Sequence, residues 1–387
     1  MINFKSASLK EVLSHKTMYY EKIDYSIVSK SWYILSKYLK LPYIIHIIGT
    51  NGKGSTGRFL AHYLQKKSYK VLHYSSPHIQ KFNERIWING KDCNDFDLNF
   101  ANKKLQEYLP LNLLEKLTYF EYTTLLSLIL SDGFDYLVFE AGLGGEFDAT
   151  NVVPSNLSLV TTIDLDHQSF LGNTIEDIAK TKMRSADSKM IIGYQIHKEV
   201  YKIAFEVKKE LKEEFGRVIE VKKVENFDLL ALKKYPLFLQ RNLCLVLKAL
   251  EELKIEIDIK LFDDVKLFGR CQKISDNITV DVGHNPLAAE SLREEFKNDK
   301  IVLIYNSYKD KDYEKVLNIL KPVIKEMIIL EIDDKRIVNK NNLLDICKKL
   351  NIIINTNSKI RKDENYLVFG SFLVVENFLK SLEIDER

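Results

Sequence analysis

The sequence contains few cysteines and no long apolar run. Cysteine occurs only four times, at positions far apart and never as a Cys-x-x-Cys pair (Cys93, Cys244, Cys271 and Cys347), so neither a zinc site nor a disulfide framework is predicted. Reduced thiols fit a reducing compartment. No apolar stretch approaches the about 20 residues that a helix needs to cross a bilayer, and Met1 to Lys16 alternates polar and apolar residues instead of forming a cleavable signal. We expect a soluble, cytoplasmic protein with no membrane partner.

The sequence also lacks an excess of charge of one sign. Its 57 basic and 54 acidic residues give a net charge of +3, which leaves no surplus for holding a polyanion, so we expect no nucleic-acid partner. No low-complexity linker or solenoid repeat interrupts the chain. With 387 residues, of which 45% are hydrophobic, the chain exceeds one typical core, and two domains are expected.

One glycine-rich stretch stands out from the rest. The apolar run 44–48 leads directly into Gly49-Thr50-Asn51-Gly52-Lys53-Gly54-Ser55-Thr56. Glycines let backbone N–H groups approach an anion, the following helix directs its N-terminus to the same place, and Lys53 adds a positive charge. The pattern departs from the usual phosphate loop, because Ile47 replaces a glycine and Gly54 replaces a hydroxyl. An ordinary strand-to-helix turn is the alternative interpretation, but this composition favours phosphate binding.

The surrounding segments predict a parallel sheet. Residues 1–40 have amphipathic helical spacing and are expected to pack against the first strand. A helix after the glycine-rich turn and a strand at 70–74 complete a βαβ unit. Residues 84–87 followed by Asn89-Gly90 resemble a hairpin strand with a tight turn, and helices are predicted at 96–109 and 119–130.

Three predicted strands end in polar side chains. Ser75-Ser76 follows the strand at 70–74, Glu140 ends the strand at 135–140, and the strand at 157–163 leads into Asp164, Asp166 and His167. For one strand alone, a solvated loop residue is the simpler interpretation. Because ligands bind beyond the carboxyl ends of parallel strands, all three together favour a site for metal and phosphate.

The remainder of the chain predicts a second α/β block. A helix at 175–186 carries Lys180, Lys182 and Arg184, which by themselves indicate a solvated basic face. Residues 197–223 are predicted to form a surface helix and a strand. Strands at 279–282, 301–304, 327–330 and 352–354 alternate with helical stretches. We therefore predict domains at 1–263 and 264–387.

The motifs, in their order, resemble those of the folylpolyglutamate synthase/dihydrofolate synthase family, which belongs to the Mur ligase superfamily. The resemblance runs from about Ile44 to the end of the chain. It implies a Mur-ligase-like P-loop α/β domain with a mostly parallel sheet and a smaller C-terminal Rossmann-like α/β domain. The motifs that carry it are the glycine-rich turn 49–55, Ser75-Ser76-Pro77-His78, Phe82-Asn83-Glu84-Arg85-Ile86, Phe120-Glu121-Tyr122-Thr123-Thr124, Glu140-Ala141-Gly142-Leu143-Gly144-Gly145, Asp148-Ala149-Thr150-Asn151, Asp166-His167, Gly269-Arg270 and His284-Asn285-Pro286.

The resemblance implies a ligase that uses ATP and Mg²⁺, with two metal ions, and we expect a monomer. The carboxylate of dihydropteroate or of a folate would attack the γ-phosphate, and the amine of L-glutamate would displace phosphate from the resulting acyl phosphate. Each domain would carry part of the site, so domain closure is the expected gating step.

The resemblance also implies roles for individual residues. Lys53 and the loop Gly49 to Thr56 would hold the ATP phosphates, with Ser55 or Thr56 as a supporting hydroxyl. Ser76 and Glu140 would bind the first Mg²⁺. The implied ligands of the second ion are His167, Glu140 and a carbamylated lysine at Lys182. The residues similar to those that hold the γ-phosphate, ribose and adenine are Arg270, Asp281 and His284, with Asn242 as an adenine contact.

Four residues, at three places in the chain, depart from the family pattern. Met183-Arg184 stands where Ala-Gly usually follows the modified lysine, Glu146 replaces a basic residue, and Gly283 replaces an alanine. The chain between 188 and 262 is compact, so we expect trimmed loops on the substrate side.

Other functions remain open at this stage. The enzyme could have both activities of the family or only one, because both reactions share the ATP and metal machinery. A cell-wall Mur ligase would carry a UDP-binding domain before the phosphate loop, and only 48 residues precede Gly49. A nucleotide-binding regulator without turnover is a third possibility, although such a protein has no need of Lys53, Glu140, His167 and Lys182 together.

Overall fold

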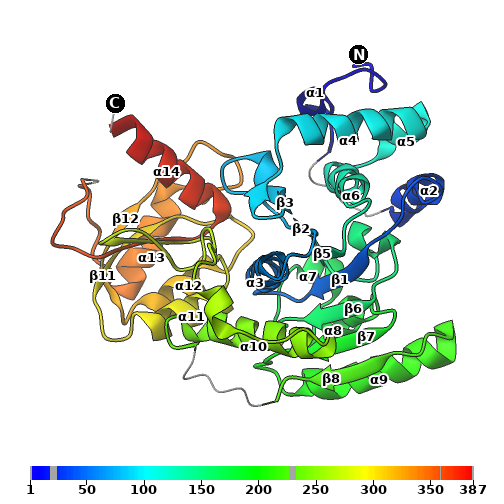
Figure 1. The fold of residues 1–387 in the computed structure, drawn as a ribbon. Helices are drawn as coiled ribbons and strands as arrows, with labels where there is room; N and C mark the ends of the chain where they lie inside the picture. The colour runs from blue at the N-terminus through cyan, green and yellow to red at the C-terminus, as the bar shows by residue number, and fades with distance from the viewer. Residues whose placement is uncertain (1, 18–23, 226–231, 358, 386–387) are drawn as a thin grey trace. The chain divides into compact units, whose positions relative to one another are not determined.

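The computed structural model describes residues 2–17, 24–225, 232–357 and 359–385. The chain forms two compact units, one made of 1–232 with 239–265 and the other of 233–238 with 266–387. Both are α/β, and the predicted fold class is confirmed (Figure 1). Each unit is described by itself.

The first unit is built on an eight-stranded sheet in the order β4-β3-β2-β5-β1-β6-β7-β8. The strands from β2 to β8 in this order run parallel to one another. β3 pairs antiparallel with β2, and β4 pairs antiparallel with β3. The carboxyl ends of β2, β5, β1 and β6 therefore meet at one edge. The strands are β1 Tyr43–Ile48, β2 Val71–Tyr74, β3 Ile86–Ile88, β4 Lys91–Asp92, β5 Tyr136–Glu140, β6 Leu157–Val160, β7 Lys189–Ile192 and β8 Glu220–Lys223.

Helices pack against this sheet through two hydrophobic clusters. One joins α1, α2, α4, α5 and α6 to Ile44, Leu72 and Phe139 of the sheet, and the other joins α8 and α9 to Val160 and Ile192. The helices are α1 Leu9–Ser14, α2 Tyr25–Leu35, α3 Lys53–Lys66, α4 Asp95–Tyr108, α5 Leu111–Lys116, α6 Tyr119–Leu130, α7 Gln168–Leu171, α8 Ile175–Met183, α9 Glu199–Phe215 and α10 Leu237–Glu252, with 3-10 turns η1 Phe82–Arg85, η2 Ala149–Val152 and η4 Ile259–Phe262.

Two expectations for this unit need correction. The described residues between 2 and 40 form two short helices, and α2 packs on α5, α6 and η2 more than on the first strand. The predicted strand at 84–87 begins only at Ile86, because η1 occupies Phe82–Arg85. The carboxylate of Glu84 accepts the backbone N–H groups of Ile79, Gln80 and Lys81 at 2.7, 2.9 and 2.7 Å, which holds the chain in a turn there.

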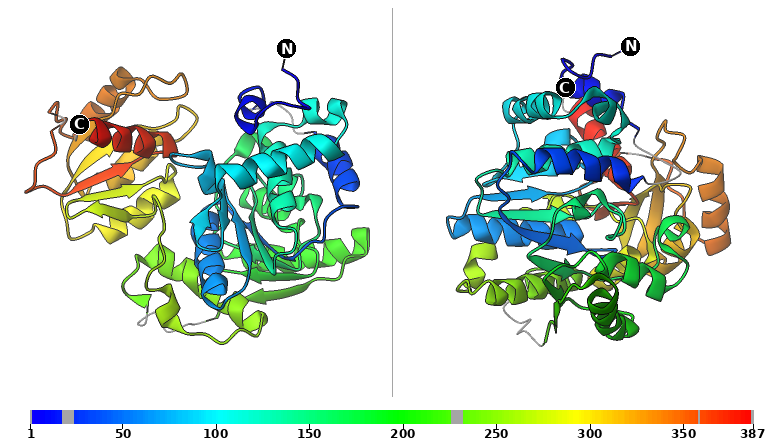
Figure 2. Two further views of the ribbon diagram at one scale, coloured as in Figure 1. Left: turned by 45° about the horizontal axis from the view of Figure 1, so that its top comes forward. Right: turned by 90° about the vertical axis from the view of Figure 1, so that its right-hand side faces the viewer.

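The second unit contains a five-stranded sheet in the order β12-β11-β13-β10-β9, parallel except for β9 (Figure 2). The prediction of a strand at 352–354 is wrong: this segment makes a single bridge, from Ile354 to Met327, because it follows the end of α13 directly. The missed strand β13 pairs with β11 instead. The elements are β9 Gln272–Ser275, β10 Ile278–Asp281, α11 Pro286–Glu295, β11 Ile301–Tyr305, α12 Tyr313–Leu320, β12 Ile324–Ile329, α13 Lys340–Leu350, β13 Tyr366–Phe369 and α14 Phe372–Asp385.

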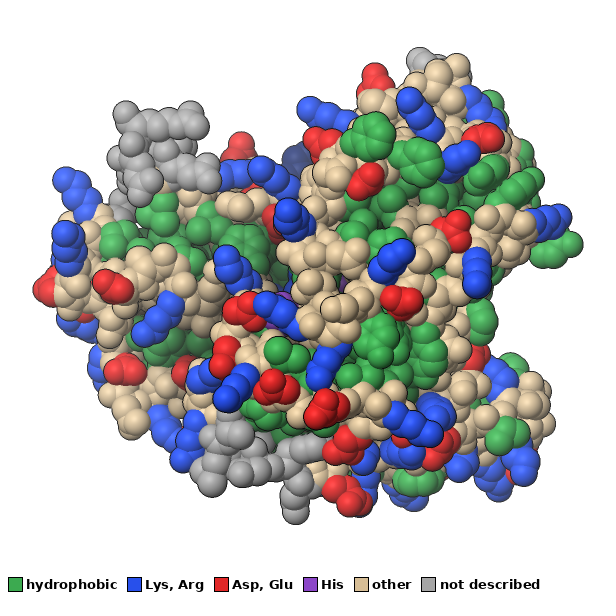
Figure 3. Space-filling view, viewed as in Figure 1, with side chains coloured by type: hydrophobic (Ala, Val, Ile, Leu, Met, Phe, Trp, Pro, Cys, Tyr) green, Lys and Arg blue, Asp and Glu red, His purple; other side chains and the backbone are tan. Residues whose placement is uncertain are grey.

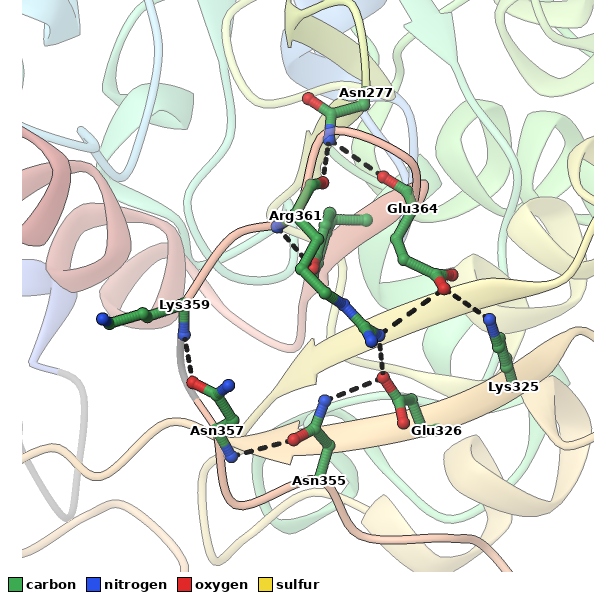
Figure 4. A network of polar contacts seen from close by, with 9 residues as sticks. Asn277, Lys325, Glu326, Asn355, Asn357, Lys359, Arg361 and Glu364 are labelled. Atoms are coloured by element: carbon green, nitrogen blue, oxygen red, sulfur yellow. Dashed lines mark hydrogen bonds and ion pairs between the residues drawn. The ribbon is translucent and has the colours of Figure 1, made fainter.

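A polar network joins the start of β12 to residues that precede β13 (Figure 4). Glu326 on β12 accepts hydrogen bonds from Arg361 and Asn355, both at 2.7 Å. The amide of Asn277 donates to the carbonyls of Arg361 and Glu364 at 2.8 and 2.9 Å. These contacts fix the irregular segment before β13.

The exposed surface carries charges of both signs. On the face seen in Figure 3, basic and acidic side chains are interspersed instead of forming a single patch. Among the helices of the described residues, none combines the length and the apolar character needed to span a membrane.

Candidate active site

The glycine-rich turn joins β1 to α3 and is tied to the end of β6. Gly49 and Gly52 have φ angles of +143° and +92°, which side chains with a β-carbon rarely adopt. A β-carbon at Gly49 would also lie 2.0 Å from the hydroxyl of Thr161. The N–H groups of Thr50 and Asn51 donate to the carbonyl of Thr162 at 2.9 and 3.2 Å, so β6 holds the turn in place.

Lys53 begins α3 and folds back over this turn. Its ammonium donates to the carbonyls of Gly49 and Thr50 at 3.2 and 3.3 Å. Ser55 donates to the carbonyl of Gly52 at 3.1 Å, whereas the buried hydroxyl of Thr56 has no hydrogen-bond partner among the residues that the structure describes. A buried hydroxyl without a partner is uncommon, and this one lies in the first turn of a helix that follows a glycine-rich loop.

Asn242 on α10 lies against the same turn. Its amide donates to the hydroxyl of Ser55 at 2.9 Å, and a β-carbon at Gly52 would come within 2.6 Å of its Oδ1. Only the family resemblance pointed to this residue, since α10 has no local sequence motif. Its predicted contact with adenine stays a prediction.

Ser76 and Glu140 lie together at the carboxyl edge of the sheet. Glu140 ends β5, and its side chain is buried. Its Oε2 accepts the N–H of Ser76, in the loop after the neighbouring strand β2, at 3.4 Å. The sequence placed these two residues at the ends of different strands, and the parallel pairing of β2 with β5 brings them together.

His167 stands at the start of α7 with a left-handed φ of +52°. Its Nε2 lies 3.8 Å from Oδ2 of Asp166, and its side chain is 44% exposed. The N–H of His167 also donates to Asp166 at 2.9 Å. The imidazole is thus held beside a carboxylate and is accessible from solvent.

Lys182 is buried, so the expectation of a solvated basic face on α8 is wrong for this residue. Its residue exposure is 4%. Burial, and after it the charge of Lys53, lowers the pKa of its amine to about 7, although Asp166 and Asp148 act in the opposite direction. Hydrophobic spacing alone could not distinguish Lys182 from Lys180, which is ion-paired on the outer side of the helix.

The loop after β5, which contains Gly142, Gly144 and Gly145 and is called the glycine loop below, lies against the backbone of α8. The N–H of Glu146 donates to the carbonyl of Thr181 at 2.9 Å, and a β-carbon at Gly145 would lie 2.3 Å from the carbonyl oxygen of Lys182. Two of the residues that depart from the family pattern face each other here: Arg184 lies 3.6 Å from the carboxylate of Glu146.

Asp148 is a buried carboxylate to which the sequence analysis gave no role. It accepts the N–H groups of Leu143 and Thr150 at 2.7 and 3.0 Å. Burial raises its pKa, and these hydrogen bonds oppose that effect. The position of Asp148 within the motif 148–151 was visible in the sequence, but its burial was not.

A small recess, with a cavity volume of about 20 Å³, lies beside this carboxylate. Among the described residues, its walls include three acidic side chains and two phenylalanines and neither lysine nor arginine. Burial raises the pKa of Glu121, one of the three. The lining residues are Asp24, Thr118, Phe120, Glu121, Leu143, Phe147, Asp148 and Ala149.

In the second unit, Arg270, Asp281 and His284 lie near the carboxyl end of β10. Asp281 is buried and accepts the N–H groups of Cys271 and Gly283 at 2.8 and 2.7 Å. Burial raises its pKa, and the charge of Arg270 opposes that effect. The ring of His284 contacts the carbonyl of Val282 at 3.3 Å. Asp281 therefore shapes the turns that present Arg270 and His284.

No group of three or more His, Cys, Asp or Glu side chains able to hold a metal occurs in the part of the chain that the structure describes. The predicted ligand set does not need one. It combines Glu140 and His167 with a hydroxyl and a modified lysine.

Comparison with known proteins gives a consistent result. Residues 47–267 match the family model of the Mur ligase middle domain. The dihydrofolate synthase/folylpolyglutamate synthase of Haemophilus influenzae is 31% identical over 89% of this chain and 90% of its own length. The crystal structure of Helicobacter pylori folylpolyglutamate synthetase is 38% identical, with a TM-score of 0.77 over 97% of this chain and 98% of that one. Escherichia coli FolC in complex with DHPP and ADP shares the fold, with 24% identity and a TM-score of 0.83 over the full length of both chains.

Proposed function

The chain belongs to the folylpolyglutamate synthase/dihydrofolate synthase family of the Mur ligase superfamily, and we propose that it is an ATP-dependent ligase that adds L-glutamate to dihydropteroate and to folates. The carboxylate oxygen of the pterin substrate attacks the γ-phosphorus of ATP, and ADP leaves. The amine of glutamate then attacks the acyl carbon, and phosphate leaves with the former carboxylate oxygen. The protein's task is to position three substrates and to stabilise the charge that develops.

The glycine-rich turn is the proposed site of the ATP phosphates. Its backbone N–H groups and the N-terminus of α3 favour an anion. The ammonium of Lys53 now contacts the carbonyls of Gly49 and Thr50. In our proposal it exchanges these contacts for phosphate oxygens when the nucleotide binds.

Divalent metal would bind next to this turn. Ser76 and Glu140, 3.4 Å apart through the Ser76 N–H, would hold one Mg²⁺, and Glu140, His167 and Lys182 would hold a second. The unpartnered hydroxyl of Thr56 fits a role beside the first ion. Bound Mg²⁺ neutralises phosphate charge and prefers oxygen ligands, so Lys182 suits the site only as a carbamate.

The surroundings of Lys182 fit that modification. Carbamylation needs a neutral amine, which attacks carbon dioxide and releases a proton. Because burial lowers the pKa of Lys182 to about 7, much of the amine is neutral near neutral pH. A fully exposed lysine would remain protonated there.

The pterin substrate would bind at the mouth of the recess beside Asp148, because the recess itself, of about 20 Å³, is smaller than a pterin ring. The three carboxylates of the recess disfavour an anionic group and favour a ligand rich in N–H donors. Phe120 and Phe147 offer aromatic surface for a flat ring. A pterin ring, which is flat and carries an amino group and a ring N–H, meets both requirements.

The two domains follow the two compact units in this proposal. The first would bind ATP and the pterin substrate, and the C-terminal one would act as the glutamate-ligase domain, with Arg270, Asp281 and His284 serving the nucleotide. All of the proposed residues belong to one chain, so a monomer suffices.

One observation carries the proposal. Lys182 is buried, and the positive charge of Lys53 in the glycine-rich turn helps to lower the pKa of its amine. The test is incubation of the purified protein with ATP, Mg²⁺, labelled L-glutamate and either dihydropteroate or tetrahydrofolate. Label is expected in both products. Incorporation with one acceptor alone would reduce the proposal to a single activity, and incorporation with neither would overturn it.

A further inference from the structure

A chain of alternating charges links the two helices α8 and α9 to the glycine loop. Lys180 lies 2.8 Å from Glu176 and 3.4 Å from Glu210. Arg184 donates to the other carboxylate oxygen of Glu210, Oε2, through Nε at 3.2 Å and Nη2 at 2.9 Å. Its other terminal nitrogen lies 3.6 Å from the carboxylate of Glu146. The guanidinium of Arg184 therefore bridges α9 and the glycine loop.

The bridge is partly shielded from water. The side chains of Arg184, Glu146 and Glu210 are 32%, 22% and 23% exposed, whereas the ordinary surface pair Lys202–Glu206 on α9 is 83% and 40% exposed. Solvent and salt weaken exposed pairs most. The planar fork of an arginine also fixes direction better than a lysine ammonium does.

The loop that Arg184 reaches has two other neighbours. On one side, Leu143, Phe147 and Asp148 of this loop line the recess. On the other side, the N–H of Glu146 donates to the carbonyl of Thr181, the residue before Lys182. The loop thus stands between the recess and the turn of α8 that carries Lys182.

We propose that Arg184 is a positioning residue that holds the glycine loop against α8 through Glu146, and so sets the recess relative to Lys182. This inference rests on the proposed function for its catalytic consequence. The helices themselves have another source of stability, because Ile178, Met183, Val200 and Ala204 pack in a shared core beneath the charges. Through its contact with Glu146, Arg184 holds the glycine loop against these packed helices.

Lys180 offers a matched control. It lies on the same helix one turn earlier and shares Glu210, but among the residues that the structure describes its ion pairs are with Glu176 and Glu210 alone. Substitution to methionine removes the charge at either position and keeps a long side chain. Arg184→Met should release the loop, whereas Lys180→Met should leave it in place.

The first measurement is hydrogen exchange of the intact protein. Arg184→Met and Glu146→Gln should both speed exchange of the Glu146 amide and its loop, and Lys180→Met should not. The double variant should be no faster than Arg184→Met, because both changes break the same contact. Arg184→Lys should restore part of the protection. Exchange that is unchanged in Arg184→Met, or equally fast in Lys180→Met, would overturn the proposal.

The second measurement is steady-state kinetics. Arg184→Met should raise KM for dihydropteroate by roughly ten-fold, which corresponds to about 1.4 kcal/mol of substrate binding, and leave KM for ATP unchanged. An equal rise in both constants would point to general loosening and overturn the positioning role. If the unaltered enzyme has no ligase activity, the proposed function fails, and the exchange experiment still decides whether Arg184 holds the loop.

Discussion

Gly145 packs so closely against Lys182 that a β-carbon on the glycine would lie 2.3 Å from the lysine carbonyl oxygen and 2.8 Å from its Cα. Both of these are backbone atoms, which cannot rotate away as the end of a side chain can. The loop after β5 and the turn that carries Lys182 therefore have one fixed separation, and the absence of a side chain at position 145 allows it.

Gly145→Ala should separate the loop from α8. Overpacking typically costs about 1–3 kcal/mol, and we expect a loss of that size in the free energy of unfolding together with a large loss of glutamate ligation. Gly216→Ala is the control, because its β-carbon meets open space and only the left-handed φ of +65° is strained. Denaturant unfolding and ligase assays of both variants test this. Full activity in Gly145→Ala would contradict the close packing.

Lys53→Ala should abolish ATP turnover and leave the fold intact. The ammonium contacts only carbonyls of its own loop within the described structure, so little packing is lost. Loss of one preorganised donor to a charged transition state costs roughly 10²–10³-fold in rate. ATP hydrolysis and ligation rates, with thermal unfolding as the check on folding, measure this. Unchanged turnover would refute the phosphate role.

Lys182→Ala should remove a metal ligand and reduce ligation at least about 100-fold, since even substitutions outside the ligand shell cost 10–100-fold. Lys180→Ala, two residues earlier on the outer side of α8, should retain activity. The two variants should also differ in Mn²⁺ binding measured by calorimetry. Equal binding and equal rates would remove Lys182 from the site.

The amine of Lys16 predicts a pH dependence of stability. It is buried, donates to the carbonyls of Leu114 and Glu115, and burial lowers its pKa to about 8, with Glu121 opposing. The folded protein therefore disfavours the charged form, and this unfavourable contribution is full below pH 8 and is relieved as pH rises toward the unfolded-state pKa near 10.4. The free energy of unfolding should gain on the order of 2 kcal/mol between pH 7 and 9.5 from this group.

Comparison with Lys16→Met isolates that contribution. Other groups that titrate in this range are common to both proteins. The unfolding free energy of the unaltered protein minus that of Lys16→Met should therefore rise with pH. A difference that is constant from pH 7 to 9.5 would show that the Lys16 amine is solvated in the folded state.

The elements with a strong local pattern were predictable from the sequence. The helix at Tyr119–Leu130 matches its predicted bounds, and β1 with its glycine-rich turn and α3 occur as expected. The strand at Ile352–Ile354 was mispredicted because three consecutive apolar residues do not indicate whether they pair with a neighbouring strand. The hairpin with its turn at Asn89-Gly90 is present, but its first strand starts two residues later than predicted, because periodicity does not reveal that Glu84 accepts three backbone N–H groups.

The candidate site was only partly predictable. Strand ends identified Glu140 and the Ser76 loop, since parallel pairing brings such ends together. Burial is a tertiary property, so the sequence alone could not separate Lys182 from Lys180 or show that Asp148 is enclosed. The pairing of Glu146 with Arg184 also joins segments 38 residues apart, and single-sequence spacing carries no signal for such a contact.

The most direct test of the ligase mechanism follows the carboxylate oxygen. Dihydropteroate labelled with ¹⁸O in its carboxylate is incubated with the enzyme, ATP, Mg²⁺ and L-glutamate, and the released phosphate is analysed by mass spectrometry. Attack on the γ-phosphate predicts one ¹⁸O atom in each phosphate formed with product. Product accompanied by unlabelled phosphate would contradict the account.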